Sequence, residues 1–200
     1  INEYFGSPNT KTLVIPSEIS GYTVISTKEF ICTNRQNIIE VVLPTTLKTI
    51  KTKSFSNFSN LEKIHIPVSV ESIEPRAFVM CNKLSQFTCS PNNLYYTVID
   101  NALFNKDETE IICAPGASGD YYLPDTVKVI GEYAFYGNDI SSITSNSLVE
   151  IKEFGINQCL SLKEINIYGE QFKTLRKFAI CNGNPLNFNT VTLPSSLEII

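Results

Sequence analysis

The chain has 200 residues, 42% of them hydrophobic and 18% charged, so it can bury a substantial core. Its net charge of −4 gives a nucleic-acid partner no electrostatic support. No apolar run approaches the roughly 20 residues that span a bilayer, so we expect no membrane insertion by this segment. The sequence begins INEYFG and ends SSLEII, without an initiator Met or a signal peptide, and we expect a slice of a longer protein.

A repeated motif runs along the chain. The copy VVLPTTLKTIKTKSF at residues 41–55 aligns without gaps to residues 64–78 and 121–135. In all three copies a Pro is followed by an apolar residue at +3, Ile at +6 and Phe at +11. Residues 13–30 fit if three residues are inserted, and residues 191–200 repeat the first half. With three degenerate copies, the proline slots fall at 16, 44, 67, 90, 124, 146, 168 and 194.

The residues around each proline slot predict a short strand. The residues one and three positions before the slot are apolar or aromatic at fifteen of the sixteen positions. Such alternating residues point to the same side of a strand, and Pro ends the strand because it cannot donate a ladder bond. A single coil cannot bury these side chains, whereas stacked coils share a core and pair their strands in parallel. The pattern therefore predicts a solenoid.

The motif resembles the BspA-like, or Treponema pallidum-type, leucine-rich repeats. Their consensus runs roughly L-x-x-I-x-I-P-x-x-V-x-x-I-x-x-x-A-F-x-x-C-x-x-L, and residues 61–84 match every specified position. The resemblance implies a leucine-rich-repeat solenoid, α/β or mostly β, with a parallel sheet on the concave side and irregular or short helical segments on the convex side. We expect one domain over residues 1–200 with about seven coils.

The longest interval between slots holds an insertion over residues 95–115. Two runs there alternate apolar and polar residues, with turn candidates at Asp100-Asn101 and at residues 106–109. We expect a β-hairpin that projects from one coil; the alternative is a longer loop over the core edge. Proteins with this type of repeat often carry such a hairpin, with Gly where this chain has Asn101.

The six cysteines could serve as metal ligands, disulfide partners or core residues. There is no C-x-x-C pair and only one His, which disfavours zinc. Cys81 and Cys159 share a repeat position about three coils apart, too far for a bridge. We expect buried structural thiols, with Cys89 also in the core; the least implausible disulfide is Cys159–Cys181.

Nothing in the sequence predicts catalysis or a cofactor. His65 is the only His, and no nucleophile elbow, phosphate-binding loop or dinucleotide fingerprint is present. His65 should face solvent, where it could also touch a ligand. Lys48, Lys51 and Lys53 could meet an anionic partner or simply form a solvated convex face.

The candidate binding surface follows from strand alternation. Residues between the two buried positions of each strand must face the concave side, and those two positions earlier form a second ladder. Such a broad polar surface suits a protein or glycan ligand, although it could also be only a solvated sheet. The candidate ligand-binding residues are Val42, Lys63, His65, Gln86, Thr88, Tyr122, Thr144, Glu164, Asn166 and Thr192.

The repeat and the missing catalytic residues favour a non-enzymatic ligand-binding domain. Proteins that share the motif are mostly surface proteins of bacteria and of some parasitic protists. The resemblance thus implies a cell-surface or secreted location and adhesion to host or neighbouring-cell protein or glycan. The alternative is a cytoplasmic protein-interaction scaffold, which six unpaired cysteines mildly favour.

Overall fold

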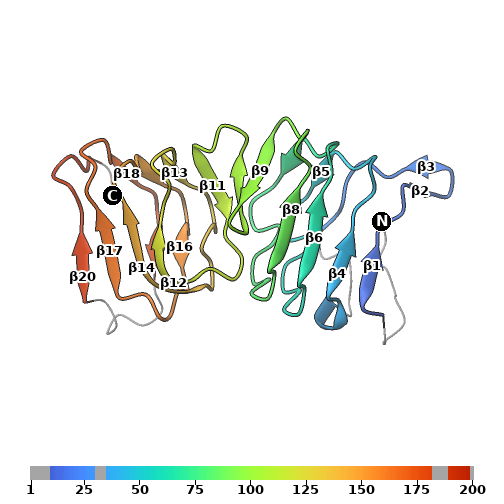
Figure 1. The fold of residues 1–200 in the computed structure, drawn as a ribbon, viewed down its shortest axis with the longest axis horizontal. Coiled ribbons are helices and arrows are strands. Elements are labelled where there is room, and N and C mark those ends of the chain that lie inside the picture. The colour runs from blue at the N-terminus through green and yellow to red at the C-terminus, as the bar shows by residue number, and fades with distance from the viewer. Residues whose placement is uncertain (1–9, 30–34, 182–188, 199–200) are drawn as a thin grey trace.

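The structure, a computed structural model, describes residues 10–29, 35–181 and 189–198. These residues form coils stacked along the long axis of the molecule (Figure 1). Strands of successive coils lie side by side and pair in parallel, as the repeat predicts. The leucine-rich-repeat solenoid is confirmed in a form that is almost entirely β.

The main strands form two four-stranded parallel sheets. In the third strand of the first sheet, Ile64 and Ile66 are fully buried while Lys63 and His65 are exposed, and Pro67 follows the strand end. The first sheet has the order β1 (Thr12–Val14), β4 (Glu40–Val42), β6 (Lys63–Ile66), β8 (Gln86–Cys89). The second has the order β12 (Ser118–Tyr122), β14 (Asp139–Ser145), β17 (Glu164–Ile167), β20 (Thr190–Thr192).

The opposite, convex side of the coils carries mainly two-residue strands and turns. Ile50 and Ile73 share the +6 repeat position, lie in register on adjacent strands and are buried. Within the described ranges the one helix is a 3-10 turn, η1 (Arg35–Asn37). The convex strands are β5 (Thr49–Ile50), β7 (Ser72–Ile73), β13 (Val129–Ile130), β15 (Glu150–Ile151) and β18 (Thr174–Leu175); two further pairs are β2 (Glu18–Ile19) with β3 (Tyr22–Thr23) and β16 (Ile156–Asn157) with β19 (Ile180–Cys181).

The inserted segment forms the expected hairpin. The two residues at its first turn, Asp100 and Asn101, have φ of 47° and 62°, which Asp and Asn tolerate. The hairpin lies within the stack rather than projecting from it, because Leu103 and Phe104 are buried and its last strand pairs in parallel with β13 (Figure 1). The three strands are β9 (Tyr96–Ile99), β10 (Ala102–Asn105) and β11 (Glu110–Cys113).

The hairpin separates two hydrophobic clusters. Leu103 packs into the N-terminal cluster, whereas Ala102 and Phe104 pack into the C-terminal one. This division follows from strand alternation, because successive side chains of β10 point to opposite faces. The hairpin thus lies between the two halves of the solenoid and contributes buried side chains to both.

Most repeat positions are buried as expected. Ile73, Phe78 and Leu84 are 9%, 4% and 1% exposed. Four of the sixteen strand positions depart from the expectation: Cys89, Tyr121 and Leu193 are only half-buried, and Val191 is 50% exposed. Val191 lies on β20, the last strand in the order of its sheet, so no described strand covers it.

Each convex turn contains residues in the left-handed region. The residue before the Ala-Phe position has a φ of 53° to 65° in five coils, and all five residues are larger than Gly. Bulky residues there cost of order 1–3 kcal/mol each and persist because the surrounding coil fixes them. The five residues are Lys53, Arg76, Tyr133, Phe154 and Phe178.

Candidate functional site

The exposed side of the two main sheets, here called the concave face, brings the candidate residues into register. Lys63 pairs with Gln86, and His65 with Thr88. In the second sheet the pairing runs in two rows from strand to strand. The rows are Asp120–Ser142–Glu164–Thr190 and Tyr122–Thr144–Asn166–Thr192.

The candidate residues differ in how far they are exposed. Tyr122 is 72% exposed and Val42 is 42% exposed. Lys63, His65, Gln86, Thr88 and Glu164 are also exposed, whereas Thr144, Asn166 and Thr192 are intermediate. Tyr122 therefore offers the largest apolar surface of the concave face to a partner.

Polar contacts between coils hold part of this face in place. The Lys63 ammonium lies 2.7 Å from the Glu40 carboxylate, and both groups are partly solvated. His65 Nδ1 and Thr88 Oγ1 share a hydrogen bond of 2.9 Å. Contacts between solvated groups add little stability, but they fix side-chain directions on a rigid sheet.

Ser142, in the row that begins at Asp120, is not available to a ligand. It is only 8% exposed, and its hydroxyl donates to Asp120 Oδ1 at 2.8 Å. Ser141 donates to the same oxygen at 2.7 Å. These two hydrogen bonds lower the pKa of Asp120, so the row begins with a fixed negative charge.

The concave face is not one continuous ladder. Thr88 on β8 and Tyr122 on β12 belong to different sheets, and the hairpin lies between these strands in Figure 1. The sequence predicted two unbroken rows because the repeat spacing does not show where an insertion interrupts the sheet. Two patches result: one with Lys63 and His65, the other with Tyr122 and Asn166.

The three lysines of the convex face do not form a free basic patch. Each lies 2.5–2.7 Å from a glutamate of a neighbouring coil, and the pairs are solvated. This arrangement fits the solvated-face interpretation and offers little to an anionic partner. The pairs are Lys48–Glu71, Lys51–Glu74 and Lys53–Glu29.

The repeat's cysteine position is a packing position with a hydrogen-bond donor. Cys81 and Cys159 are each 1% exposed. Their thiols donate to the carbonyl oxygens of Phe55 and Phe135, at 3.1 and 2.7 Å. Where Asn138 replaces Cys, its amide donates to an earlier carbonyl in the same way. The expectation of buried structural thiols is confirmed for Cys81 and Cys159 and is wrong for Cys181, which is exposed; Cys159 and Cys181 are both free thiols. Cys32 lies outside the described residues.

We expect these two buried thiols to resist alkylation in the folded protein. Burial raises the pKa of Cys81 to about 12 and that of Cys159 to about 11, so the thiolate is scarce near neutral pH. Cys181 is exposed and should react. Iodoacetamide labelling followed by peptide mass mapping, with and without denaturant, measures this difference. Native labelling of Cys81 as fast as that of Cys181 would contradict it.

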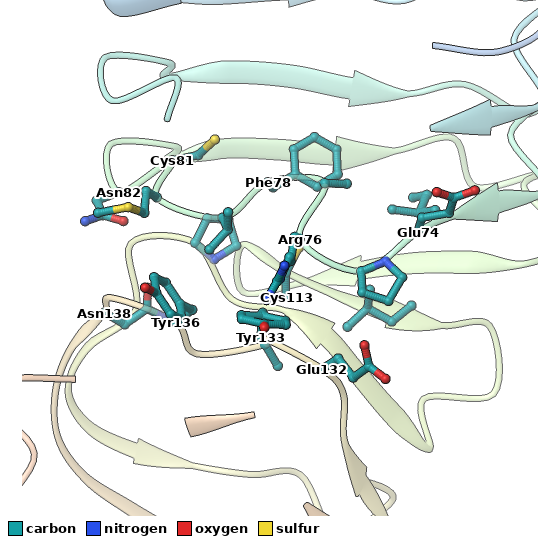
Figure 2. A pocket seen from close by; sticks show the side chains of 18 residues that line it. Glu74, Arg76, Phe78, Cys81, Asn82, Cys113, Glu132, Tyr133, Tyr136 and Asn138 are labelled. Atoms are coloured by element: carbon teal, nitrogen blue, oxygen red, sulfur yellow. The ribbon is translucent and has the colours of Figure 1, made fainter. Parts of the chain in front are cut away.

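The hairpin also creates a seam between the coil of residues 61–84 and the coil of residues 110–138. Figure 2 shows the Arg76 side chain above the Tyr133 ring, with Cζ 3.9 Å from the ring centroid. Glu74 and Glu132 lie at one end of the seam, and Asn82 and Tyr136 at the other (Figure 2). The repeat pattern did not predict this seam.

An aromatic stack continues from the seam along the convex turns. Tyr133 stacks on Phe154, and Phe154 on Phe178, with ring centroids 5.0 and 5.4 Å apart. Lys177 Nζ lies 5.0 Å from the Phe178 centroid. A signal was present in the sequence, since these aromatic residues share the position before the Ala-Phe pair.

The described ranges contain neither a metal-binding cluster nor a membrane-spanning helix. No group of three or more His, Cys, Asp or Glu side chains there could hold a metal ion. Nor does this part of the chain contain a helix long and apolar enough to cross a membrane.

Comparison with known proteins assigns the repeat. A family model described as "BspA type Leucine rich repeat region" matches six copies over residues 2–116 and 119–200. The fold is similar to the pneumococcal vaccine antigen PcpA, with a TM-score of 0.67 and 17% identity over 94% of this chain. It is also similar to a leucine rich cell surface protein of Faecalibacterium prausnitzii, with a TM-score of 0.70 and 23% identity over 94% of this chain. A T. pallidum leucine-rich repeat protein has a TM-score of 0.53 and 19% identity over 87% of this chain.

The chain spans only part of the first two of these proteins. It covers 62% of the pneumococcal chain and 54% of the F. prausnitzii chain, but 76% of the T. pallidum chain. No curated protein sequence matches it significantly.

Proposed function

Because the chain belongs to the BspA type leucine-rich repeat family, we propose that it is a non-enzymatic repeat domain that binds a protein or glycan partner through its concave face. The observation that carries the proposal is the rigid, exposed row of side chains on the two parallel sheets. Stacked coils fix such side chains at regular spacing, which suits an extended partner. A repeat protein of this type acts through surface complementarity rather than through a catalytic pocket.

The chemistry of the two patches supports contact with a protein. Tyr122, exposed over 72% of its surface, can bury a large aromatic area at low conformational cost. The second patch adds the Asn166 amide, which both donates and accepts hydrogen bonds. The first patch adds the Lys63–Glu40 ion pair and the exposed ring of His65.

We further propose that the domain works at the cell surface, in adhesion. One protein of similar fold is titled a cell surface protein and another a vaccine antigen, which supports this location. The competing proposal is a cytoplasmic scaffold that uses the same face. It is favoured by the five described cysteines, all of which are free thiols, as in reducing compartments.

Substitutions on the concave face test the binding proposal. Tyr122→Glu and Asn166→Arg should weaken binding at least about tenfold to the ligand found by screening this chain against a glycan array and a panel of purified extracellular proteins. Tyr122 is exposed and Asn166 is partly exposed, so both charges can reach solvent and the fold should stay intact. Surface plasmon resonance measures the affinity, and circular dichroism checks folding.

Lys48→Gln and Lys51→Gln on the convex face are the matched controls. They change charge at similarly solvated positions, and they should leave the affinity unchanged. If they abolish binding while the concave variants keep it, the concave face is not the binding surface.

A further inference from the structure

The seam contains a cavity of about 330 Å³ on the convex side. It forms because the regular sheet stops at β7. By the repeat spacing of 23 residues, Tyr95 and Tyr96 should continue the sheet beside Ser72 and Ile73, but the chain turns into the hairpin there instead. The cavity is therefore bounded by β7, the hairpin and the coil that follows it.

A buried phenol lines this cavity with a proton that has no acceptor. Tyr96 is 9% exposed, and its hydroxyl oxygen accepts the Ile73 N–H at 2.8 Å. No acceptor for the hydroxyl proton lies among the residues that the structure describes. A buried donor of this kind is costly to leave unmatched, so it favours a ligand oxygen or water in the cavity.

The facing wall supplies both charged donors and charged acceptors. Lys152 Nζ lies 2.7 Å from Glu110 Oε1, and both side chains are about one-third exposed. Glu110 is held further by its backbone N–H, which donates to Asn105 Oδ1 at 2.8 Å. Glu132, whose carboxylate makes no hydrogen bond or ion pair within the described residues, completes the acceptors.

Apolar surface lies among these polar groups. The half-exposed ring of Tyr95, at 47%, lines the cavity together with Ile73 and Ile112. An anionic ligand would be repelled by the carboxylates of Glu110 and Glu132. A cationic ligand would offer no acceptor for the hydroxyl proton of Tyr96. A sugar matches the lining better, because each hydroxyl both donates and accepts, and its C–H faces pack on aromatic and aliphatic side chains.

We propose that this seam cavity is a binding site for a single neutral sugar ring, separate from the concave face. Its volume lies at the small end of ligand pockets, which suits one pyranose better than a chain. Tyr96 donates to a sugar hydroxyl, Glu132 accepts from another, and Lys152 with Glu110 orients a third. The partner is thus a glycan residue at the end or on a branch of a larger ligand.

Titration of the full 200-residue chain with methyl glycosides tests this site. The probes are the methyl pyranosides of glucose, galactose, mannose and N-acetylglucosamine, followed by saturation-transfer difference NMR. At least one should bind with a dissociation constant in the millimolar range. Tyr96→Phe and Glu132→Gln should each weaken it about tenfold or more.

The control variants separate this site from the concave face. Tyr168→Phe and Glu153→Gln change the same residue types at exposed positions outside the cavity and should bind like wild type. Tyr122→Glu should also leave the methyl glycoside bound, even if it abolishes binding at the concave face. Glu132 is exposed, so its variant should fold even if Tyr96→Phe does not.

Three outcomes would overturn the proposal. The first is that no methyl glycoside binds up to its solubility limit. The second is that a glycoside binds with equal affinity to wild type and to the folded cavity variants. The third is that arginine amide binds in the cavity where the glycosides do not, which would assign the site to a cationic side chain.

Discussion

Phe78→Ala is expected to lower the free energy of unfolding by about 3–5 kcal/mol, the usual cost of truncating a buried Phe. Phe78 is 4% exposed and stacks between neighbouring coils. Its ring centroid lies 5.5 Å from that of Phe55 and 5.1 Å from that of Phe87. Removing the ring leaves a cavity between coils that the fixed backbone cannot close. Urea denaturation followed by circular dichroism measures the loss.

Phe178→Ala is the matched control for this prediction. Phe178 is 51% exposed and, among the described residues, its ring contacts that of Phe154, so its truncation should cost no more than about 1.5 kcal/mol. Equal losses for the two variants would show that the convex stack matters as much as the core. A wild-type urea midpoint for Phe78→Ala would show that Phe78 does not carry the packing.

Much of the fold could be predicted because the repeat pattern reports burial directly. Ile64 and Ile66 alternate with exposed residues, and Pro67 marks the strand end, so the strand of this coil can be predicted from the sequence alone. The pattern could not show how the insertion pairs. In the sequence, Leu103 and Phe104 are typical of any β-hairpin. They pack into two different hydrophobic clusters only because the hairpin lies between two sets of stacked coils.

The sequence predicted which residues of the candidate site are exposed, but not which of them are buried or held by neighbouring side chains. Strand alternation places His65 and Tyr122 on the exposed face, as the structure has them. It cannot show that Ser142 is buried and that its hydroxyl donates to Asp120 on the neighbouring strand. Nor could it show the left-handed turns. A Gly or Asn would have indicated a positive φ, but these positions hold residues such as Arg76 and Phe154.

The seam matters because β8 and β12 belong to different sheets, so no main-sheet ladder joins the two halves of the solenoid. Asn82 Nδ2 donates to Gly137 O at 3.2 Å, and Arg76 lies over Tyr133. Both contacts are at the surface. The hairpin must therefore carry most of the coupling between the halves, through its buried strand and through the side chain at its first turn.

Asn101→Ala is expected to destabilise the protein by about 2–4 kcal/mol, because one side chain satisfies three backbone groups. Asn101 Oδ1 accepts the Phe87 N–H at 2.8 Å. Its Nδ2 donates to Leu84 O and, at 3.2 Å, to Pro115 O. These bonds tie the edge of β8 to the hairpin turn and to the segment that leads into the second sheet.

Two further variants separate the hydrogen bonds from the backbone conformation. Asn101 has a φ of 62°, which Gly adopts freely and Ala does not. Asn101→Gly should therefore lose the three bonds but cost about 1 kcal/mol less than Asn101→Ala. Asn101→Asp should keep the bond from the Phe87 N–H and bring a carboxylate against two carbonyl oxygens.

Hydrogen exchange at the Phe87 amide distinguishes these effects. Protection should fall in Asn101→Ala and Asn101→Gly and persist in Asn101→Asp, whatever their global stabilities. If Asn101→Gly instead matches wild type in urea midpoint and in Phe87 protection, the side chain is dispensable. The coupling between the halves would then rest on the buried packing of hairpin residues such as Leu103 and Phe104 and on the pairing of β11 with β13.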